Sequence, residues 1–264
     1  MKKVQNRYAA LIARIFATHH RSGMDEFPFD RSELTTTASA LGIELPKNLG
    51  DALYSFRYRT PLPDSIAKTA RPGMVWIIKG AGKGRYLFKQ ARMSRIEPDE
   101  SMLPIKVPNA TPEILLANAF DDEQALLAKV RYNRLVDLFL GITAHSLQNH
   151  LRTTVKGVGQ IEIDELYVGL NRRGCQFVVP VQAKVGKDQH GVIQTEQDVA
   201  CCRERFPALV CRPVCVHALS DNRIAMFELT LDDDGVRIVD QKHYKLVSST
   251  EISAADLRRY GVEC

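Results

Sequence analysis

Two short stretches of the sequence carry residue types that suit metal-dependent hydrolysis. The first holds Glu162 and Asp164, and the second holds Gln182 and Lys184, each within a run of apolar and β-branched residues typical of a strand. Side chains two positions apart on a strand share one face. A hairpin register that pairs 164 with 182 would gather all four side chains on one side, and it needs a connection of odd length or a bulge. An even four-residue turn would instead place Ala183 opposite Glu162.

Such a cluster has a clear chemical use. Carboxylate and amide oxygens are hard ligands that suit Mg²⁺, which keeps several waters and leaves room for a phosphate oxygen. A lysine beside the metal can orient the attacking water and offset negative charge in the transition state of phosphate hydrolysis. The alternative is that the four residues form the solvent-exposed face of an ordinary hairpin.

The spacing of these residues resembles that of the PD-(D/E)xK nuclease superfamily. Asp164 stands 18 positions before Gln182, which opens the triplet Gln182-Ala183-Lys184 after an apolar run. The resemblance covers about residues 113–220 and implies a core of helix, three strands, helix and strand. It also implies that Asp164, Gln182 and the Ala183 carbonyl bind Mg²⁺, and that Lys184 is the catalytic lysine.

The sequence departs from the pattern of that superfamily at two positions. Ile163 stands where a proline is usual, and Gln182 replaces the usual acid, a variant that some restriction endonucleases carry. Glu162 or Glu165 would then supply the missing ligand, and Glu162 is included among the candidate catalytic residues. Restoring the acid by Gln182→Glu is expected to be tolerated.

The first 95 residues predict three helices and a hairpin. Apolar residues between positions 8 and 16 recur at helical spacing. Asp30 and Ser32 can open a second helix that runs to Leu41 and is stopped by Gly42, and a third spans 49–59. The Gly-rich segment 80–84 joins two short apolar strands. This order is that of a winged helix-turn-helix, so DNA-contacting residues are expected on the third helix and at the tip of the hairpin: Asn48, Ser55, Arg57, Arg59, Lys83 and Arg85.

Charge is distributed unevenly along the chain. Residues 1–105 hold 17 Lys and Arg against 10 Asp and Glu, which is +7, whereas residues 106–264 hold 19 against 21, which is −2. A basic N-terminal part predicts a polyanionic partner such as double-stranded DNA.

The remaining sequence predicts a linker and a second domain of mixed α/β (α+β) class. Residues 96–112 contain four prolines without helical periodicity and are interpreted as a linker between a winged-helix domain at 1–95 and a nuclease domain at 113–264. In the second domain we expect helix from Glu123 to about Arg152, with a break at Gly141, strands over 161–169 and 177–185, and a helix opened by a capping pair, Thr195 and Asp198. His145 and His150 fall on the expected helix and are assigned structural roles. Further strands are expected at 214–216, 224–231 and 236–239, so the central sheet is mixed.

Composition excludes several classes of protein. The chain has 264 residues, 45% apolar and 25% charged, which argues against disorder and coiled coil. It has no apolar run of membrane-spanning length and no signal-peptide pattern, so no membrane partner is expected. The six cysteines form no CxxC pair, which favours reduced thiols and a cytoplasmic location.

These observations together predict a Mg²⁺-dependent endonuclease that hydrolyses double-stranded DNA, most similar to type II restriction enzymes. The resemblance further implies a homodimer and a cognate DNA methyltransferase that protects the host. Two alternatives remain open at this point: a winged-helix transcription regulator with a non-catalytic α/β domain, and a structure-selective repair or recombination nuclease.

Overall fold

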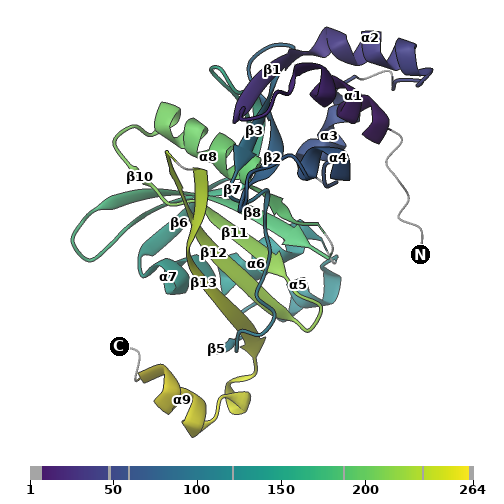
Figure 1. The fold of residues 1–264 in the computed structure, drawn as a ribbon. Coiled ribbons are helices and arrows are strands. Elements are labelled where there is room, and N and C mark those ends of the chain that lie inside the picture. Colours follow the sequence, from purple (N-terminus) through teal and green to yellow (C-terminus); the bar gives the residue numbers. More distant parts are fainter. Residues whose placement is uncertain are drawn as a thin grey trace.

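The structure is a computed structural model that describes residues 8–46, 49–58, 60–120, 122–186, 188–233 and 235–261, with Asp51 described by its main chain alone. A smaller N-terminal unit lies against one end of a larger body built on a mixed sheet (Figure 1). Asn48 and Arg59, expected to contact DNA, lie outside the described residues.

The N-terminal unit combines four helices with a small antiparallel sheet of strand order β1-β3-β2. The predicted first helix is confirmed, because its apolar stripe from Tyr8 to Phe16 is buried. The second helix ends at Gly42 as predicted, with φ +64°. The elements are α1 (Ala9–His19), β1 (Glu26–Asp30), α2 (Arg31–Leu41), α3 (Gly50–Tyr58), α4 (Asp64–Ala67), β2 (Val75–Gly80) and β3 (Arg85–Ala91).

Strand β1 was not anticipated from the sequence. Phe27 and Phe29 alternate with exposed residues along it and pack into an aromatic core with Phe16, Trp76 and Phe88. Five residues and an internal proline are too little for the alternation to stand out locally, and pairing with β3 is what makes this segment a strand.

The segment expected to be a linker contributes two strands. β4 (Arg95–Ile96) pairs with β9 (His190–Gly191), and β5 (Ile105–Pro108) adds a parallel edge strand beside β13 (Gly235–Val247). Both strands pair with the larger body, so the segment is part of that body and not a free linker.

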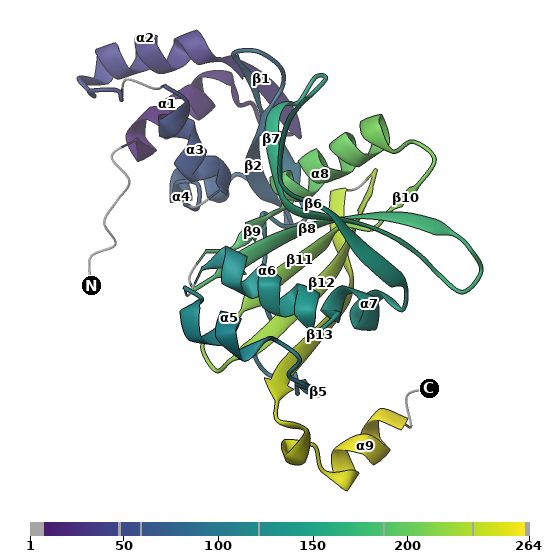
Figure 2. The same cartoon turned by 180° about the vertical axis from the view of Figure 1, so that it is seen from behind.

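The larger body is an α+β structure around one mixed sheet of strand order β5-β13-β12-β11-β8-β7-β6. Strands β6, β7 and β8 are antiparallel, and β11 runs parallel to β8. Helices α5, α6 and α7 cover one face (Figure 2), and α8 lies on the other. The remaining bounds are α5 (Glu113–Asn118), α6 (Glu123–Tyr132), α7 (Leu135–Leu140), β6 (Thr143–Val155), β7 (Gly159–Leu170), β8 (Gln176–Val185), α8 (Val192–Arg205), β10 (Val210–Cys211, beside β8), β11 (Val214–Ala218), β12 (Arg223–Asp232), the 3-10 turn Ser249–Glu251 and α9 (Ala254–Gly261).

The prediction of helix from Glu123 to about Arg152, broken at Gly141, is wrong beyond position 140. Gly141 takes a left-handed conformation, φ +64°, and ends α7, as the predicted break suggested. From Thr143 onward the chain is strand β6, not a second helix. The helical apolar stripe stops at Leu140, and the threonines and valine at the far end of β6 favour a strand.

The predicted capping role of Thr195 and Asp198 is also wrong. Helix α8 begins at Val192, and the Gly191 N–H before it donates to Gln194 Oε1 at 3.2 Å. Thr195 and Asp198 therefore lie inside the helix, and both are buried. This places a carboxyl group under the sheet, where it becomes part of the site described below.

Strands β7, β8, β11 and β12 occupy their predicted positions to within two residues at each end, and Asp232 and Gly235 pair across a hairpin turn as expected. The strand predicted at 236–239 is only the start of β13, which continues to Val247. None of the described helices is long and apolar enough to cross a membrane. All five cysteines of the described part carry free thiols: Cys175, Cys201, Cys202, Cys211 and Cys215.

Candidate active-site cleft

A cleft of about 800 Å³ lies where the N-terminal unit meets the ends of β7 and β8. Helix α3 forms one wall, α8 and the start of α6 contribute others, and Asp164, Gln182 and Lys184 lie along it. Glu162 lines it as well, so four of the candidate residues chosen from the sequence are in one cavity.

The register of β7 and β8 is the one that the candidate site requires. The ladder runs from Leu170 paired with Gln176 to Glu165 paired with Val181. Its connection is the five-residue segment 171–175, an odd length. Continuing the register by one step brings Asp164 opposite Gln182.

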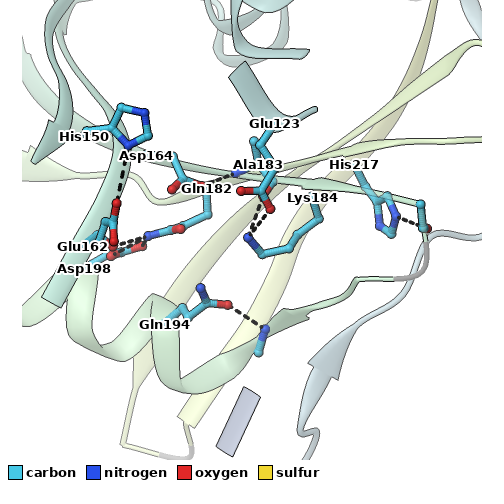
Figure 3. Close-up of polar contacts among 12 residues, drawn as sticks. Glu123, His150, Glu162, Asp164, Gln182, Ala183, Lys184, Gln194, Asp198 and His217 are labelled. Carbon is cyan, nitrogen blue, oxygen red and sulfur yellow. Dashed lines mark hydrogen bonds and ion pairs between the residues drawn. The ribbon is translucent and has the colours of Figure 1, made fainter. Parts of the chain in front are cut away.

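The regular ladder stops at that point, and side chains take over its hydrogen bonds. The Ala183 N–H donates to Asp164 Oδ2 at 2.8 Å, and Gln182 Nε2 donates to the Glu162 carbonyl at 2.9 Å (Figure 3). The two strands separate here, which opens the floor of the cleft while keeping their buried polar groups paired.

Asp198 reaches this floor from α8 on the other side of the sheet. Gln182 Nε2 lies 3.1 Å from Asp198 Oδ1 and 3.2 Å from Oδ2 (Figure 3). Both residues are 2% exposed. The Gln182 amide nitrogen is thus committed to Asp198 and to the Glu162 carbonyl, so its oxygen is the atom left to serve as a ligand.

Lys184 is held by two acceptors. Its Nζ donates to Glu123 Oε1 at 2.9 Å and to the Ala183 carbonyl at 2.6 Å (Figure 3). Burial lowers the pKa of Lys184, but the hydrogen bond to Glu123 and the charges of Asp164 and Glu123 outweigh it and raise the pKa above its ordinary value. The side chain is therefore a fixed ammonium group at the edge of the cleft.

For the two aspartates, unlike Lys184, the surroundings disfavour the charged form of the side chain. Burial raises the pKa of Asp164, and the Ala183 N–H and the charge of Lys184 offset this only in part. Burial raises the pKa of Asp198 well above its ordinary value, and the charge of Asp164 adds to the shift. For both carboxyl groups, the hydrogen bonds and the charge of Lys184 offset the cost of burial only in part.

This donor set fits a hard divalent cation. Asp164, Asp198 and Glu123 bring three carboxyl groups to the single ammonium of Lys184, and a bound cation would relieve the excess negative charge. Within the described residues no three His, Cys, Asp or Glu side chains lie close enough together to hold a metal by themselves. Two carboxylates with the Gln182 amide oxygen, completed by water, are what Mg²⁺ commonly uses. The Ala183 carbonyl, another expected ligand, already accepts from Lys184.

The structure separates the two glutamates that were alternatives for the missing ligand. Glu162 lines the cleft, but its carboxylate is turned to Arg152 Nε at 3.1 Å and His150 Nδ1 at 3.4 Å. Glu165 is fully buried away from the cleft, where it accepts from Arg131 Nε at 2.8 Å and the Ser146 hydroxyl at 2.6 Å. Glu162 is thus a residue of the cleft rim, and Glu165 is a buried structural anion.

Sequence reasoning missed Asp198, Glu123 and His150. The sequence around Asp198 did carry a signal of an unusual role. Asp198 lies among Thr195, Val199 and Cys202 on the buried face of α8, where a carboxylate is unusual. For Glu123 there was none, since it stands 61 positions before Lys184. His150 was assigned a structural role on a helix, yet it lies on β6 with φ +48° and lines the cleft.

The expected DNA-contacting residues fall into two groups. Lys83 and Arg85 are exposed at the tip of the β2–β3 hairpin. Ser55 is half-buried with its hydroxyl 2.6 Å from that of Thr60, and the guanidinium of Arg57 lies 4.9 Å from the ring centre of Tyr58. Only the first group projects into solvent.

Comparison with known proteins adds no relative to this description. No protein-family model, curated protein or solved structure matches the chain. The functional argument therefore depends on the cleft itself.

Proposed function

We propose that the protein is a Mg²⁺-dependent endonuclease that hydrolyses phosphodiester bonds of double-stranded DNA, with the activity of a type II restriction enzyme. The observation that carries the proposal is the grouping of Asp164, Gln182 and Lys184 in the cleft where β7 and β8 separate, with Asp198 buried behind them and hydrogen-bonded to Gln182. A pair of buried carboxyl groups that is only partly compensated is costly to keep in a fold without a function.

The arrangement of elements supports the same proposal. From α6 and α7 through β6, β7, β8 and α8 to β11, the order is helix, three antiparallel strands, helix and a parallel strand. This is the core that the resemblance to PD-(D/E)xK nucleases implies. In the N-terminal unit, one strand follows the first helix and a hairpin follows the later ones, with sheet order β1-β3-β2, which supports a winged helix-turn-helix.

Each residue of the cleft has a distinct part in this proposal. Asp164, Asp198 and the Gln182 oxygen would hold the metal, and the Gln182 amide fixes Asp198 by donating to both of its oxygens. When bound, Mg²⁺ would polarise the scissile phosphate and lower the pKa of a bound water. Lys184, held by Glu123, would stabilise the charge that develops on the phosphate, and its burial strengthens that interaction.

Two partners follow from the proposal. Cutting both strands at a two-fold symmetric site requires two copies of the centre, so we propose a homodimer. Restriction activity would also require a methyltransferase to protect host DNA.

The test is cleavage of plasmid prepared from a methylation-deficient host. We expect discrete products with Mg²⁺ or Mn²⁺ and none with EDTA. Lys184→Ala should lower the rate by about 10²–10³-fold, because it removes one preorganised charge from the transition state. Asp164→Asn should abolish cleavage and also remove the rise in melting temperature that Mg²⁺ gives the wild type.

Lys242→Ala, on β13 away from the cleft, is the matched control and should cut at the wild-type rate. Each variant is first checked for folding by circular dichroism. Intact plasmid with every metal would favour a DNA-binding regulator, and full activity of Lys184→Ala would refute the site as assigned. Products that depend on branches or mismatches would favour a structure-selective nuclease.

A further inference from the structure

Helix α3 turns two tyrosines toward the cleft that holds the carboxyl groups. Ala52, Leu53 and Phe56 form the buried side of α3 within the N-terminal core. Tyr54 and Tyr58, one helical turn apart, lie on a different side of the helix, and both line the cleft. The helix expected to read DNA thus faces the same space as Asp164 and Lys184.

The two tyrosines differ in how far they are committed to other contacts. Tyr58 accepts from Gln197 Nε2 of α8 at 3.3 Å, and the Arg57 guanidinium lies over its ring. Tyr54 packs its ring against that of Tyr58 at 4.9 Å between centres, yet it remains 48% exposed. Tyr58 therefore works as an anchor between the two units, and Tyr54 presents aromatic surface to the cleft.

The other walls of the cleft are rich in amide side chains. Five glutamines besides Gln182 line it, and an amide can both donate to and accept from the edge of a nucleobase. Gln189, Gln194 and Gln197 already hydrogen-bond to neighbouring residues. Gln124 and Gln160 make no side-chain hydrogen bond with any other described residue.

We propose that Tyr54, with Gln124 and Gln160, forms a subsite for one unstacked nucleobase of the strand being cut. This inference rests on the proposed nuclease function and specifies its substrate. A base can lie on an aromatic ring only after it leaves the helical stack, because a stacked base exposes only its edges. A continuous duplex remains the substrate but must extrude one base at a cost in unstacking, so DNA that already has an unpaired nucleotide at this point should bind more tightly.

Binding measured in the Lys184→Ala background tests the subsite without cleavage. Fluorescence anisotropy compares a continuous duplex with the same duplex carrying a one-nucleotide bulge, both with Mg²⁺. We expect the bulged DNA to bind at least about tenfold more tightly. Adding Tyr54→Ala should bring the ratio of the two affinities close to one, whereas Tyr54→Phe, which keeps the ring, should preserve it.

Tyr132→Ala is the matched control, since Tyr132 is 45% exposed on α6 and does not line the cleft. It should leave the ratio unchanged. Equal affinities for the two DNAs in the Tyr54-containing protein would overturn the subsite, as would a ratio unaffected by Tyr54→Ala. Bulged DNA could bind more tightly in a way that depends on Tyr54 while the wild type cleaves no DNA. That result would refute the nuclease and leave the subsite standing. Failure to bind either DNA would refute both.

Discussion

At the scale of single residues, Gln182 has the most demanding surroundings in the candidate site. Its amide nitrogen is the hydrogen-bond donor for both oxygens of the buried Asp198 and for the Glu162 carbonyl. The likeness to nucleases suggested that an acid would be tolerated here. The contacts lead to a different expectation, because a carboxylate has no hydrogen to donate and would repel Asp198.

We therefore expect Gln182→Glu to lower the free energy of unfolding by about 1–3 kcal/mol at pH 7 without metal. The new carboxyl group would have a raised pKa in the fold, so its protonated form, which can donate, stabilises the protein. The loss should accordingly shrink as the pH falls toward about 4 and grow as it rises. Mg²⁺ should restore stability by binding the added charge.

Urea unfolding at several pH values, with and without Mg²⁺, measures this effect. Gln148→Glu, at an exposed position of β6, is the control and should change stability by less than about 0.5 kcal/mol. Equal stability of Gln182→Glu and wild type at pH 7 in EDTA would show that the amide is not needed as a donor.

At the scale of elements, the close approach of β6 and β7 depends on one glycine. Gly169 pairs with Ala144 on β6, and a Cβ at position 169 would meet the Thr143 carbonyl oxygen at 2.6 Å and Ala144 Cα at 3.2 Å. Both are backbone atoms of the neighbouring strand, so they cannot move aside as a flexible side chain would. The absence of a side chain, rather than an unusual backbone angle, is what position 169 requires.

Gly169→Ala should therefore destabilise the protein by about 1–3 kcal/mol, the usual cost of forcing an extra group into a packed site. Gly80→Ala is the matched control, because its added Cβ would meet nothing nearer than 3.5 Å. Thermal and urea unfolding of both variants measure the difference. If the two glycines tolerate alanine equally well, β6 and β7 do not pack as described.

At the scale of the whole molecule, α8 joins the two units. Lys79 of β2 pairs with Glu196 of α8 at 2.5 Å, and an apolar cluster combines Ile77 with Val192 and Phe227. In Figure 1 α8 lies on the sheet beside the N-terminal unit, with its start next to β2. The basic N-terminal unit is thus held beside the cleft. DNA bound to the N-terminal unit would therefore lie close to the cleft.

If the protein binds DNA as proposed, we expect the β2–β3 hairpin, with Lys83 and Arg85 exposed, to contact the DNA backbone. Replacing Lys83 and Arg85 with alanine should weaken DNA binding and reduce the slope of log affinity against log salt by about one for each lost phosphate contact. Titrations between about 50 and 200 mM salt measure the slope. The double variant Lys242→Ala and Lys245→Ala removes the same charge from β13, far along the sheet, and should leave the slope unchanged. A slope unchanged in the Lys83 and Arg85 variant would place the hairpin away from DNA.

The sequence by itself determined the elements whose signal is local. The apolar stripe of α1, the glycine that ends α2 and the apolar runs of β7 and β8 all depend on neighbours within a few residues, and the local sequence pattern reports these directly. The same locality placed Asp164 and Lys184 on adjacent strands of one hairpin. The local pattern could not predict β6, because residues 143–155 form a strand through their pairing with β7.

Only the tertiary structure decided what surrounds those two residues. Asp198 comes from α8, Glu123 from the start of α6 and Tyr54 from the N-terminal unit, and no spacing rule links them. Their meeting depends on which face of the sheet each helix covers and on how the N-terminal unit docks against α8. Packing over long sequence separations sets both, and a one-dimensional pattern carries no record of such packing.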